Sequence, residues 1–296
     1  MRFVQYVLDA LSLGSTFALA ALGIALVFSL MRLINFAHGE IIVASAYALW
    51  YLRSEWELHW FLATIGTVSV GIAVALIMER LAFRPLRHAG PTMLLASSFA
   101  VSVTVQNFLI LSIGDDFRSV ASPSFITGTV TWGSLRLPKV SILALVVSVL
   151  FMTGLALFLR RTRLGQQMLA SAEDFDMARL LGVRANGVIA AAFAISGLLA
   201  AVLALILVAQ QGLIHIRMGL PPLLIAFVAT VIGGIGSLPG AVAGGLILGG
   251  VVTALQVALP IGLLPFRDAF TYSIVIVILL VKPEGLFGSR TRESRV

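Results

Sequence analysis

The side chains that could carry chemistry in this chain are few, and its acids are the first to consider. Glu40 is the main acid inside an apolar stretch, whereas Asp9, Glu79 and Asp268 lie at the ends of other apolar stretches. A carboxylate is costly to bury in hydrocarbon and is kept there only where it has a role. This inventory is thin for a relay of protons or sodium ions. We therefore expect the energy for any transport to come from a partner.

Nucleotide, metal and nucleophile chemistry are not encoded either. A P-loop requires Gly-x-x-x-x-Gly-Lys-Ser/Thr, and neither Lys139 nor Lys282 lies in such a frame. The four histidines are scattered over different loops and helix ends, and the chain has no cysteine. A Gly-x-Ser-x-Gly nucleophile elbow is missing as well. We expect no catalytic residue, no metal site and no cofactor in this chain.

The composition explains where these few polar groups must sit. Of the 296 residues, 59% are hydrophobic and 11% charged, and the mean hydropathy is +1.06. A soluble domain has about 25% charged residues and about 45–50% apolar ones. The net charge of +7 fits basic loops on the cytoplasmic side of a membrane better than nucleic-acid binding. The sequence therefore predicts an all-α polytopic membrane protein that is surrounded by lipid.

Apolar runs divide the chain into eight or nine transmembrane helices, some of them broken. Only helices are expected, because an open sheet cannot satisfy its backbone in lipid. The count depends on the stretch 221–258, which is either two helices or one interrupted helix. The predicted spans are 7–30, 34–52, 61–78, 93–113, 140–159, 188–209, 221–236, 240–258 and 268–281.

The basic residues predict the orientation. Thirteen of the 20 Lys and Arg residues lie in one set of alternating segments, which includes 79–92, 160–187 and the tail 282–296. Because cytoplasmic loops collect positive charge, we place these segments and the C-terminus in the cytoplasm. We read the whole chain, 1–296, as one transmembrane domain with a cytoplasmic loop at 160–187.

A short polar segment interrupts the first apolar hairpin. It reads Asn35-Phe36-Ala37-His38-Gly39-Glu40. Non-helical backbone at membrane depth is tolerated only where protein or a watery cavity surrounds it. One interpretation is a broken helix that lines a path or braces the core. The other is an ordinary turn after Arg32, with Asn35 as the N-cap of the next helix. The spacing leaves both open.

The loop 160–187 predicts an exposed amphipathic helix over 168–181. Gly182 stands where such a helix would stop. One face carries acids and a base: Glu173, Asp174, Asp176 and Arg179. The other face is apolar at helical spacing: Met168, Ala172, Phe175, Ala178 and Leu181. The helix either rests on the membrane surface or binds a partner.

A glycine-rich stretch begins at Gly233 and superficially resembles a nucleotide loop. Without a preceding strand or an acid at the required distance, a dinucleotide site is not expected. Small residues instead let membrane helices approach closely. We expect helix packing at Gly233, Gly234, Gly236, Gly240, Gly244 and Gly245.

Four blocks of the sequence resemble the permeases of branched-chain amino-acid ABC transporters, specifically the LivH-type subunit. The first is Leu33 to Glu40, the second Ala170 to Val183 and the third Gly233 to Gly245. The fourth, Lys282-Pro283-Glu284-Gly285-Leu286-Phe287-Gly288, is similar to the family's C-terminal ending, with Lys in place of the usual Arg. The blocks follow the family order and span nearly the whole chain.

This resemblance implies an ABC importer in the bacterial inner membrane. Its parts would be two permease subunits (identical or different), two cytoplasmic ATP-binding subunits that hold ATP and Mg, and a periplasmic or extracellular substrate-binding protein. The resemblance implies that one cytoplasmic loop docks on the ATPase, here through Ala172, Glu173, Asp174, Phe175, Ala178, Arg179, Leu181 and Gly182. It also favours a path-lining or structural role for Asn35, Phe36, His38, Gly39 and Glu40.

Branched-chain or related hydrophobic amino acids are the expected substrates, and urea or short amides are the alternative within related permeases. A second hypothesis is a stand-alone channel or facilitator, which would leave the 168–181 helix without a partner. A third is a membrane enzyme that uses His38 and Glu40, for which the sequence offers no third catalytic group.

Overall fold

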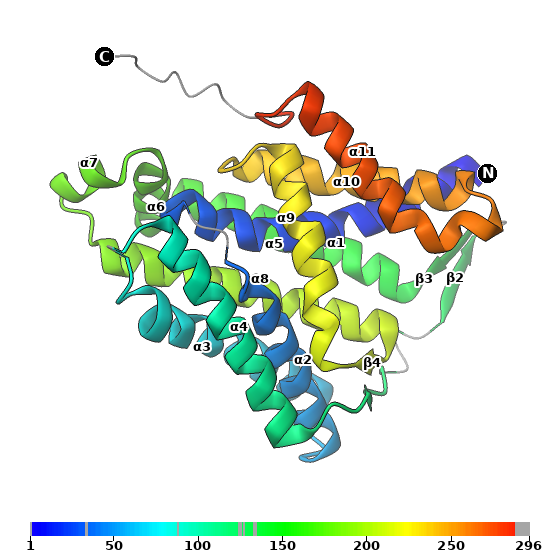
Figure 1. The fold of residues 1–296 in the computed structure, drawn as a ribbon. Helices are drawn as coiled ribbons and strands as arrows, with labels where there is room; N and C mark the ends of the chain where they lie inside the picture. The colour runs from blue at the N-terminus through cyan, green and yellow to red at the C-terminus, as the bar shows by residue number, and fades with distance from the viewer. Residues whose placement is uncertain are drawn as a thin grey trace.

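The computed structural model describes residues 2–32, 35–87, 89–123, 126, 128–132 and 135–287. It is a bundle of helices with very little sheet (Figure 1), as the composition predicts. Within the described residues, eight helices are long and apolar enough to cross a membrane. A further, shorter helix of 17 residues, His38–Ser54, covers most of the predicted span 34–52. The predicted all-α polytopic fold is therefore confirmed.

The long helices follow the apolar runs of the sequence, and the connections α4–α5 and α5–α8 are the long ones. They are α1 (Arg2–Met31), α2 (His38–Ser54), α3 (Trp60–Met78), α4 (Pro91–Ile113), α5 (Lys139–Arg161), α8 (Ala185–Gln211), α9 (Leu220–Gly233), α10 (Leu238–Ala258) and α11 (Arg267–Val281). The shorter helical pieces are η1 (Glu79–Phe83), α6 (Arg163–Glu173), α7 (Phe175–Leu180), η2 (Ile216–Gly219) and η3 (Ile261–Phe266).

Four short strands lie in the connections. β1 (Arg118–Ser119) pairs with β4 (Leu213–Ile214), and β2 (Thr129–Trp132) pairs with β3 (Leu135–Pro138), both antiparallel. Figure 1 shows the β2–β3 hairpin at one end of the bundle, near the N-terminus, and α6 and α7 at the other end. The strands close loops, and Ile214 of β4 also packs into the hydrophobic core.

Helices α1 and α8 form the centre of the bundle. Helix α1 packs against α5, α8, α9 and α10, and α8 also packs against α2 and α3. Small side chains are frequent on the buried faces, as Ala18, Ala21 and Ala25 show on α1. In lipid, close van der Waals packing between helices replaces the hydrophobic driving force available in water. The centre of the bundle is therefore built on small residues.

Glycines on α10 bring its backbone directly against two neighbours. A Cβ atom added at Gly245 would overlap the backbone of Ala18 on α1. One added at Gly244 would overlap the carbonyl of Ala229 on α9. Gly240 and Gly233 likewise face each other with no side chain between their backbones. The result is a tight layer of α1, α10 and α9.

The stretch 221–258 forms two helices. Helix α9 ends at Gly233, and α10 begins after Ser237, whose Oγ accepts a hydrogen bond of 3.1 Å from the N–H of Gly240. The connection contains Gly234 and Gly236, both at positive φ (104° and 89°), a conformation that glycine adopts without strain. This loop settles the boundary that hydropathy alone left open.

The C-terminal segment completes the end of α9. The N–H groups of Leu286 and Phe287 donate to the carbonyls of Ile232 and Gly233, at 2.7 and 3.2 Å. Gly285, at φ 79°, fits directly against Gly234, where a Cβ would overlap the backbone. These bonds satisfy carbonyl groups that a helix end otherwise leaves without partners.

We predict that Gly245→Ala destabilises the protein, because the added methyl group must push α1 and α10 apart. Overpacking of this kind costs about 1–3 kcal/mol. The midpoint of thermal unfolding in mild detergent should fall. Gly250→Ala on the same helix is the matched control, because a Cβ there meets nothing within 4 Å. Equal midpoints for the two variants would contradict the prediction.

Candidate functional site

The segment 35–40 lies inside the bundle. The ring of His38 packs against Gly23 of α1, where an added Cβ would come within 2.9 Å of the ring atom Cε1. Gly23 precedes Met31, the last residue of α1, by eight positions, or about 12 Å along a helix axis. The chain therefore turns back into the bundle after α1, and α2 begins at depth.

Asn35 supports this turn without capping α2. The N-cap position is Ala37, which has no side-chain cap. The Oδ1 atom of Asn35 instead accepts a hydrogen bond of 3.0 Å from the N–H of Ala37. Asn35 is itself 3% exposed. Its side chain thus satisfies a buried backbone donor in the non-helical stretch, where water is excluded.

His38 joins α2 to α8 and α1. Its Nδ1 lies 3.2 Å from the Oγ of Ser196, and that hydroxyl donates to the carbonyl of Gly23 at 2.8 Å. A hydroxyl has one hydrogen, and Ser196 gives it to Gly23. His38 must therefore carry its proton on Nδ1 and donate it to Ser196. This chain of bonds ties three helices at the start of α2.

Glu40 joins α2 to α4. Its Oε1 accepts hydrogen bonds from the Oγ of Ser102 (2.8 Å) and the Nε2 of Gln106 (2.7 Å). The residue is 4% exposed, and Oε2 has no partner among the described residues. Nearby, the rings of Phe36 and Phe99 stack with centroids 4.3 Å apart. The segment therefore contacts α4 through the buried carboxylate of Glu40 and the ring of Phe36.

Gly39 brings the first turn of α2 against η2. A Cβ at Gly39 would lie 2.9 Å from the carbonyl oxygen of Gly219, and one at Gly219 would overlap the backbone of Gly39. Four of the segment's predicted residues thus have contacts on separate elements: Phe36 and Glu40 on α4, His38 on α1 and α8, and Gly39 on η2. The segment 35–40 is therefore the place where α1, α4, α8 and η2 meet α2.

The prediction of one continuous helix over 168–181 is wrong. The stretch forms two helices, α6 and α7, which are separated at Asp174. Asp174 is extended (φ −143°, ψ 105°), and its Oδ1 accepts a hydrogen bond of 2.9 Å from the N–H of Met177. Asp favours such N-cap positions over helix interiors. The local cap outweighs the helical periodicity of the apolar residues.

The faces of this pair follow the predicted pattern with one exception. Glu173, Asp174, Asp176 and Arg179 are exposed, and Met168 and Ala178 are buried, whereas Ala172 and Phe175 are half-buried. Leu181 was expected on the buried face but is 80% exposed. It follows the last helical residue, Leu180, and has left the helical path. Leu180 and Met177 are exposed as well, at 82% and 53%.

Gly182 ends α7 as predicted. It has φ +89°, and its N–H donates to the carbonyl of Arg179, while the N–H of Val183 donates to that of Ala178. This is the Schellman pattern, for which a left-handed glycine is preferred. The exposed leucines of α7 are therefore presented on a well-defined turn.

A cavity of about 620 Å³ lies between α6, the end of α1, the glycine loop and the C-terminal segment. Arg32, Glu173, Ser237 and Glu284 are among its lining residues. Arg32 also donates to the carbonyl of Ala172 at 3.3 Å. The cavity separates α6 from the tight α9–α10 layer, so α6 is attached to the bundle mainly on one side. Residues 288–296 of the predicted tail lie outside the described residues.

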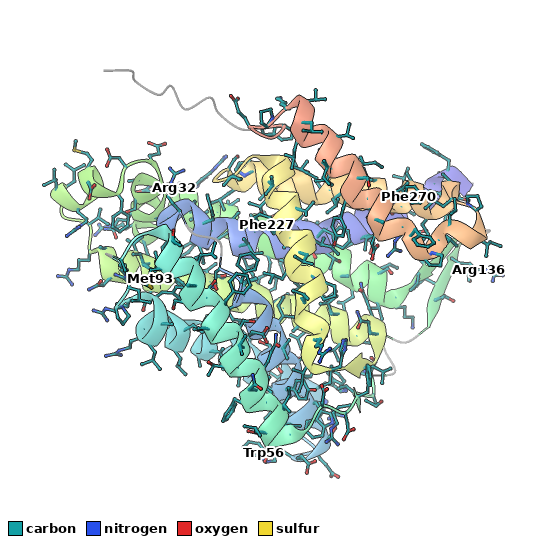
Figure 2. The ribbon with its side chains drawn as sticks, in the orientation of Figure 1. Arg32, Trp56, Met93, Arg136, Phe227 and Phe270 are labelled. Atoms are coloured by element: carbon teal, nitrogen blue, oxygen red, sulfur yellow. The ribbon has the colours of Figure 1, made fainter. Side chains whose placement is uncertain are left out.

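Basic segments that are distant in sequence gather at this end. Arg87 pairs with the buried Glu79 and donates to Asn186 Oδ1 at 2.6 Å, which joins η1 to the start of α8. Figure 2 shows Arg32 and Met93 towards the α6–α7 end and Arg136 at the opposite end. The segments grouped by the distribution of basic residues therefore share one end of the bundle.

The partners of the 35–40 segment were missed in the sequence. Ser102 and Gln106 are spaced i, i+4 and Ser196 lies in another apolar run, so each looks like an ordinary packing residue. The i, i+4 spacing of two polar residues in one span was the available signal, since such residues share a helix face. The spacing does not indicate that their partner is Glu40.

Known proteins resemble this chain over nearly its whole length. A family model described as "Branched-chain amino acid transport system / permease component" matches residues 6–281. The high-affinity branched-chain amino acid transport system permease protein BraD of Pseudomonas aeruginosa is 36% identical, over 97% of this chain and 96% of its own length. LivH of Escherichia coli K12 is 34% identical with the same coverage. A probable LivH of Methanocaldococcus jannaschii is 25% identical over 94% of this chain.

We predict that Ser196→Ala destabilises the bundle, because it leaves the Nδ1–H of His38 without its acceptor and removes the bond from Ser196 to the carbonyl of Gly23. Interhelical hydrogen bonds in membranes are worth about 1–2 kcal/mol. Thermal unfolding in detergent measures the loss. Ser29→Ala is the control, since the Ser29 hydroxyl bonds only to Leu26 of its own helix, at 2.8 Å. A Ser196 variant as stable as the control would refute the role assigned to this bond.

Proposed function

Because this chain belongs to the family of branched-chain amino acid transport permeases, we propose that it is the membrane-spanning subunit of an ATP-driven importer for branched-chain or related hydrophobic amino acids. The observation that carries the proposal is the family match over residues 6–281. The relatives that share about a third of its residues are named as high-affinity permeases for these substrates. The multi-pass helical bundle agrees with a transport role.

The chain is not itself an enzyme, and its energy comes from two cytoplasmic ATP-binding subunits that carry ATP and Mg. The absence of a P-loop frame around either lysine supports this division of labour. So does the α6–α7 pair, which presents Met177, Leu180 and Leu181 beside exposed acids. Apolar anchors with a polar rim are the usual composition of a protein interface. This surface is the docking site for an ATP-binding subunit.

The α6–α7 end and the C-terminus face the cytoplasm of the bacterial inner membrane. The positive-inside rule supports this orientation, since thirteen of the 20 basic residues lie in the segments assigned to this side. A substrate-binding protein would then approach the opposite end, which carries the β2–β3 hairpin (Figure 1). A second permease subunit, identical or different, completes the translocation path beside this one.

The link between ATP and transport runs through α6. Arg32 connects the end of α1 to the backbone of α6, and the adjoining cavity of about 620 Å³ leaves room for α6 to shift. Closure of the ATP-binding subunits would move α6 and α7, and α1 would transmit the displacement to the start of α2. The expected response is a rocking between inward-open and outward-open states.

Purification from native membranes in mild detergent, followed by mass spectrometry, tests the proposal. Recovery of this chain with two ATP-binding subunits and a second permease would support the importer. Recovery of the chain alone as a homo-oligomer, with passive flux in vesicles, would overturn it in favour of a facilitator.

We predict that replacing Leu180 and Leu181 together by serine lowers capture of the ATP-binding subunit about tenfold or more. Two exposed apolar anchors at an interface contribute about 1–2 kcal/mol each. Co-purified ATPase per permease is the measurement. Ile261→Ser is the matched control, because Ile261 is 88% exposed in η3, away from α7. Undiminished capture by the double variant would contradict the assigned docking surface.

A further inference from the structure

Glu40 occupies an unusual position for an acid. It lies in the first turn of α2, which begins inside the bundle. Its partners Ser102 and Gln106 lie near the middle of α4. The carboxyl group is therefore close to half-way along a membrane-spanning helix. An ionisable group at that depth is expected to have a function.

Only half of this carboxyl group is satisfied. Both hydrogen bonds from α4 go to Oε1, whereas Oε2 is buried and has no partner in the part of the chain that the structure describes. A proton on Oε2 would remove the buried charge, but its O–H would have no acceptor among the described residues. The ion pairs among the described residues are Arg87–Glu79 and Arg267–Asp268, and neither involves Glu40. A buried unpaired oxygen is costly, so a donor from outside the chain would be favourable here.

The surroundings suit a cation that carries an apolar group. Glu40 lies in the first turn of α2, where the helix carries partial positive charge, and an ammonium group offers three donors to a carboxylate oxygen. Phe99 lies one turn before Ser102 on α4 and stacks on Phe36. Aromatic rings accept both cations and hydrocarbon side chains.

We propose that the free Oε2 of Glu40 binds the ammonium group of the amino acid during its passage. The proposal rests on the proposed function. Ser102 and Gln106 act as positioning residues, since they hold Oε1 and so fix which oxygen remains available. Phe36 and Phe99 supply the neighbouring apolar surface. Selectivity for an ammonium group would thus be built into the membrane domain itself.

Helix α4 covers this site. Most of its side chains are exposed, and among the long helices it packs against α2. Gly90 and Gly114 flank it at positive φ (85° and 92°), and a Cβ at Gly90 meets nothing within 4 Å. Figure 1 shows α4 running alongside α2 at the edge of the bundle. Movement of α4 away from α2 would open Oε2 to the substrate.

Glu40→Gln separates this role from a structural one. The glutamine carbonyl still accepts both bonds from α4, whereas its amide removes the charge and replaces the acceptor Oε2 with a donor. In vesicles that contain the complete transporter with its binding protein and ATP, initial uptake of radiolabelled leucine should fall about tenfold or more. Glu57→Gln, in the exposed α2–α3 connection, is the control and should leave uptake unchanged.

A comparison of Glu40→Asp with Glu40→Gln adds a second test. The two hypotheses predict opposite orders for the uptake rates of these variants, and the comparison does not require either variant to be fully stable. Aspartate keeps the charge but is one methylene shorter, so it weakens the bonds to α4. If Glu40 binds an ammonium group, the Asp variant should transport faster than the Gln variant. If the residue only anchors α4, the Gln variant should be the faster and the more stable in thermal unfolding, and the proposal fails.

The remaining outcomes distinguish this inference from the function on which it rests. Wild-type uptake with an unaffected Glu40→Gln variant overturns the inference and leaves the importer standing. No uptake of any branched-chain amino acid by the wild-type assembly overturns the proposed function instead. A requirement for sodium that disappears in Glu40→Gln would assign Oε2 to a metal ion and also overturn the inference.

Discussion

Every backbone N–H and C=O group within the bilayer must find a partner inside the protein, because hydrocarbon offers none. Regular helices meet this demand by themselves, and the ends of helices do not. The C-terminal segment shows one solution, since Leu286 and Phe287 donate to the last carbonyls of α9. Ser237 shows another at the start of α10. Hydrogen bonding, more than hydrophobicity, therefore fixes where chain breaks are tolerated.

The break between α1 and α2 is the demanding case, because it lies within the bundle. Asn35 accepts a hydrogen bond from the N–H of Ala37, and the hydroxyl of Ser196 links His38 to the carbonyl of Gly23 on α1. Glycines at the crossing with η2 remove the side chains that would otherwise keep the backbones apart. Among the described residues, Oε2 of Glu40 is then the buried side-chain oxygen of this segment that has no hydrogen-bond partner. The segment that permits the break thus also holds a half-satisfied carboxyl group.

Much of this arrangement could be predicted from the sequence, and the failures have identifiable causes. Hydropathy located the spans because the bilayer requires long apolar helices. The prediction of one helix over 168–181 was wrong because the spacing of apolar residues carries no information about helix caps. Asp174 caps the start of α7 and so separates it from α6. Leu181 moved to the surface for the same local reason, since α7 ends at Leu180. The partners of Glu40 lie 62 and 66 residues away, and no local pattern encodes such a distance.

The bundle combines a stiff centre with two loosely attached parts, and this contrast is what transport requires. Helices α1, α9 and α10 are in backbone contact, so they move together if they move at all. Helix α4 is held to α2 through Glu40 and an aromatic pair. Helix α6 packs on α5 and α8, and Arg32 links it to the end of α1. Under the proposed function, α6 receives the displacement from the ATP-binding subunit and α4 covers the path. Helix α1 and the buried start of α2 lie between them. A rigid element with a bistable contact at each end can carry a coupling over that distance without deforming.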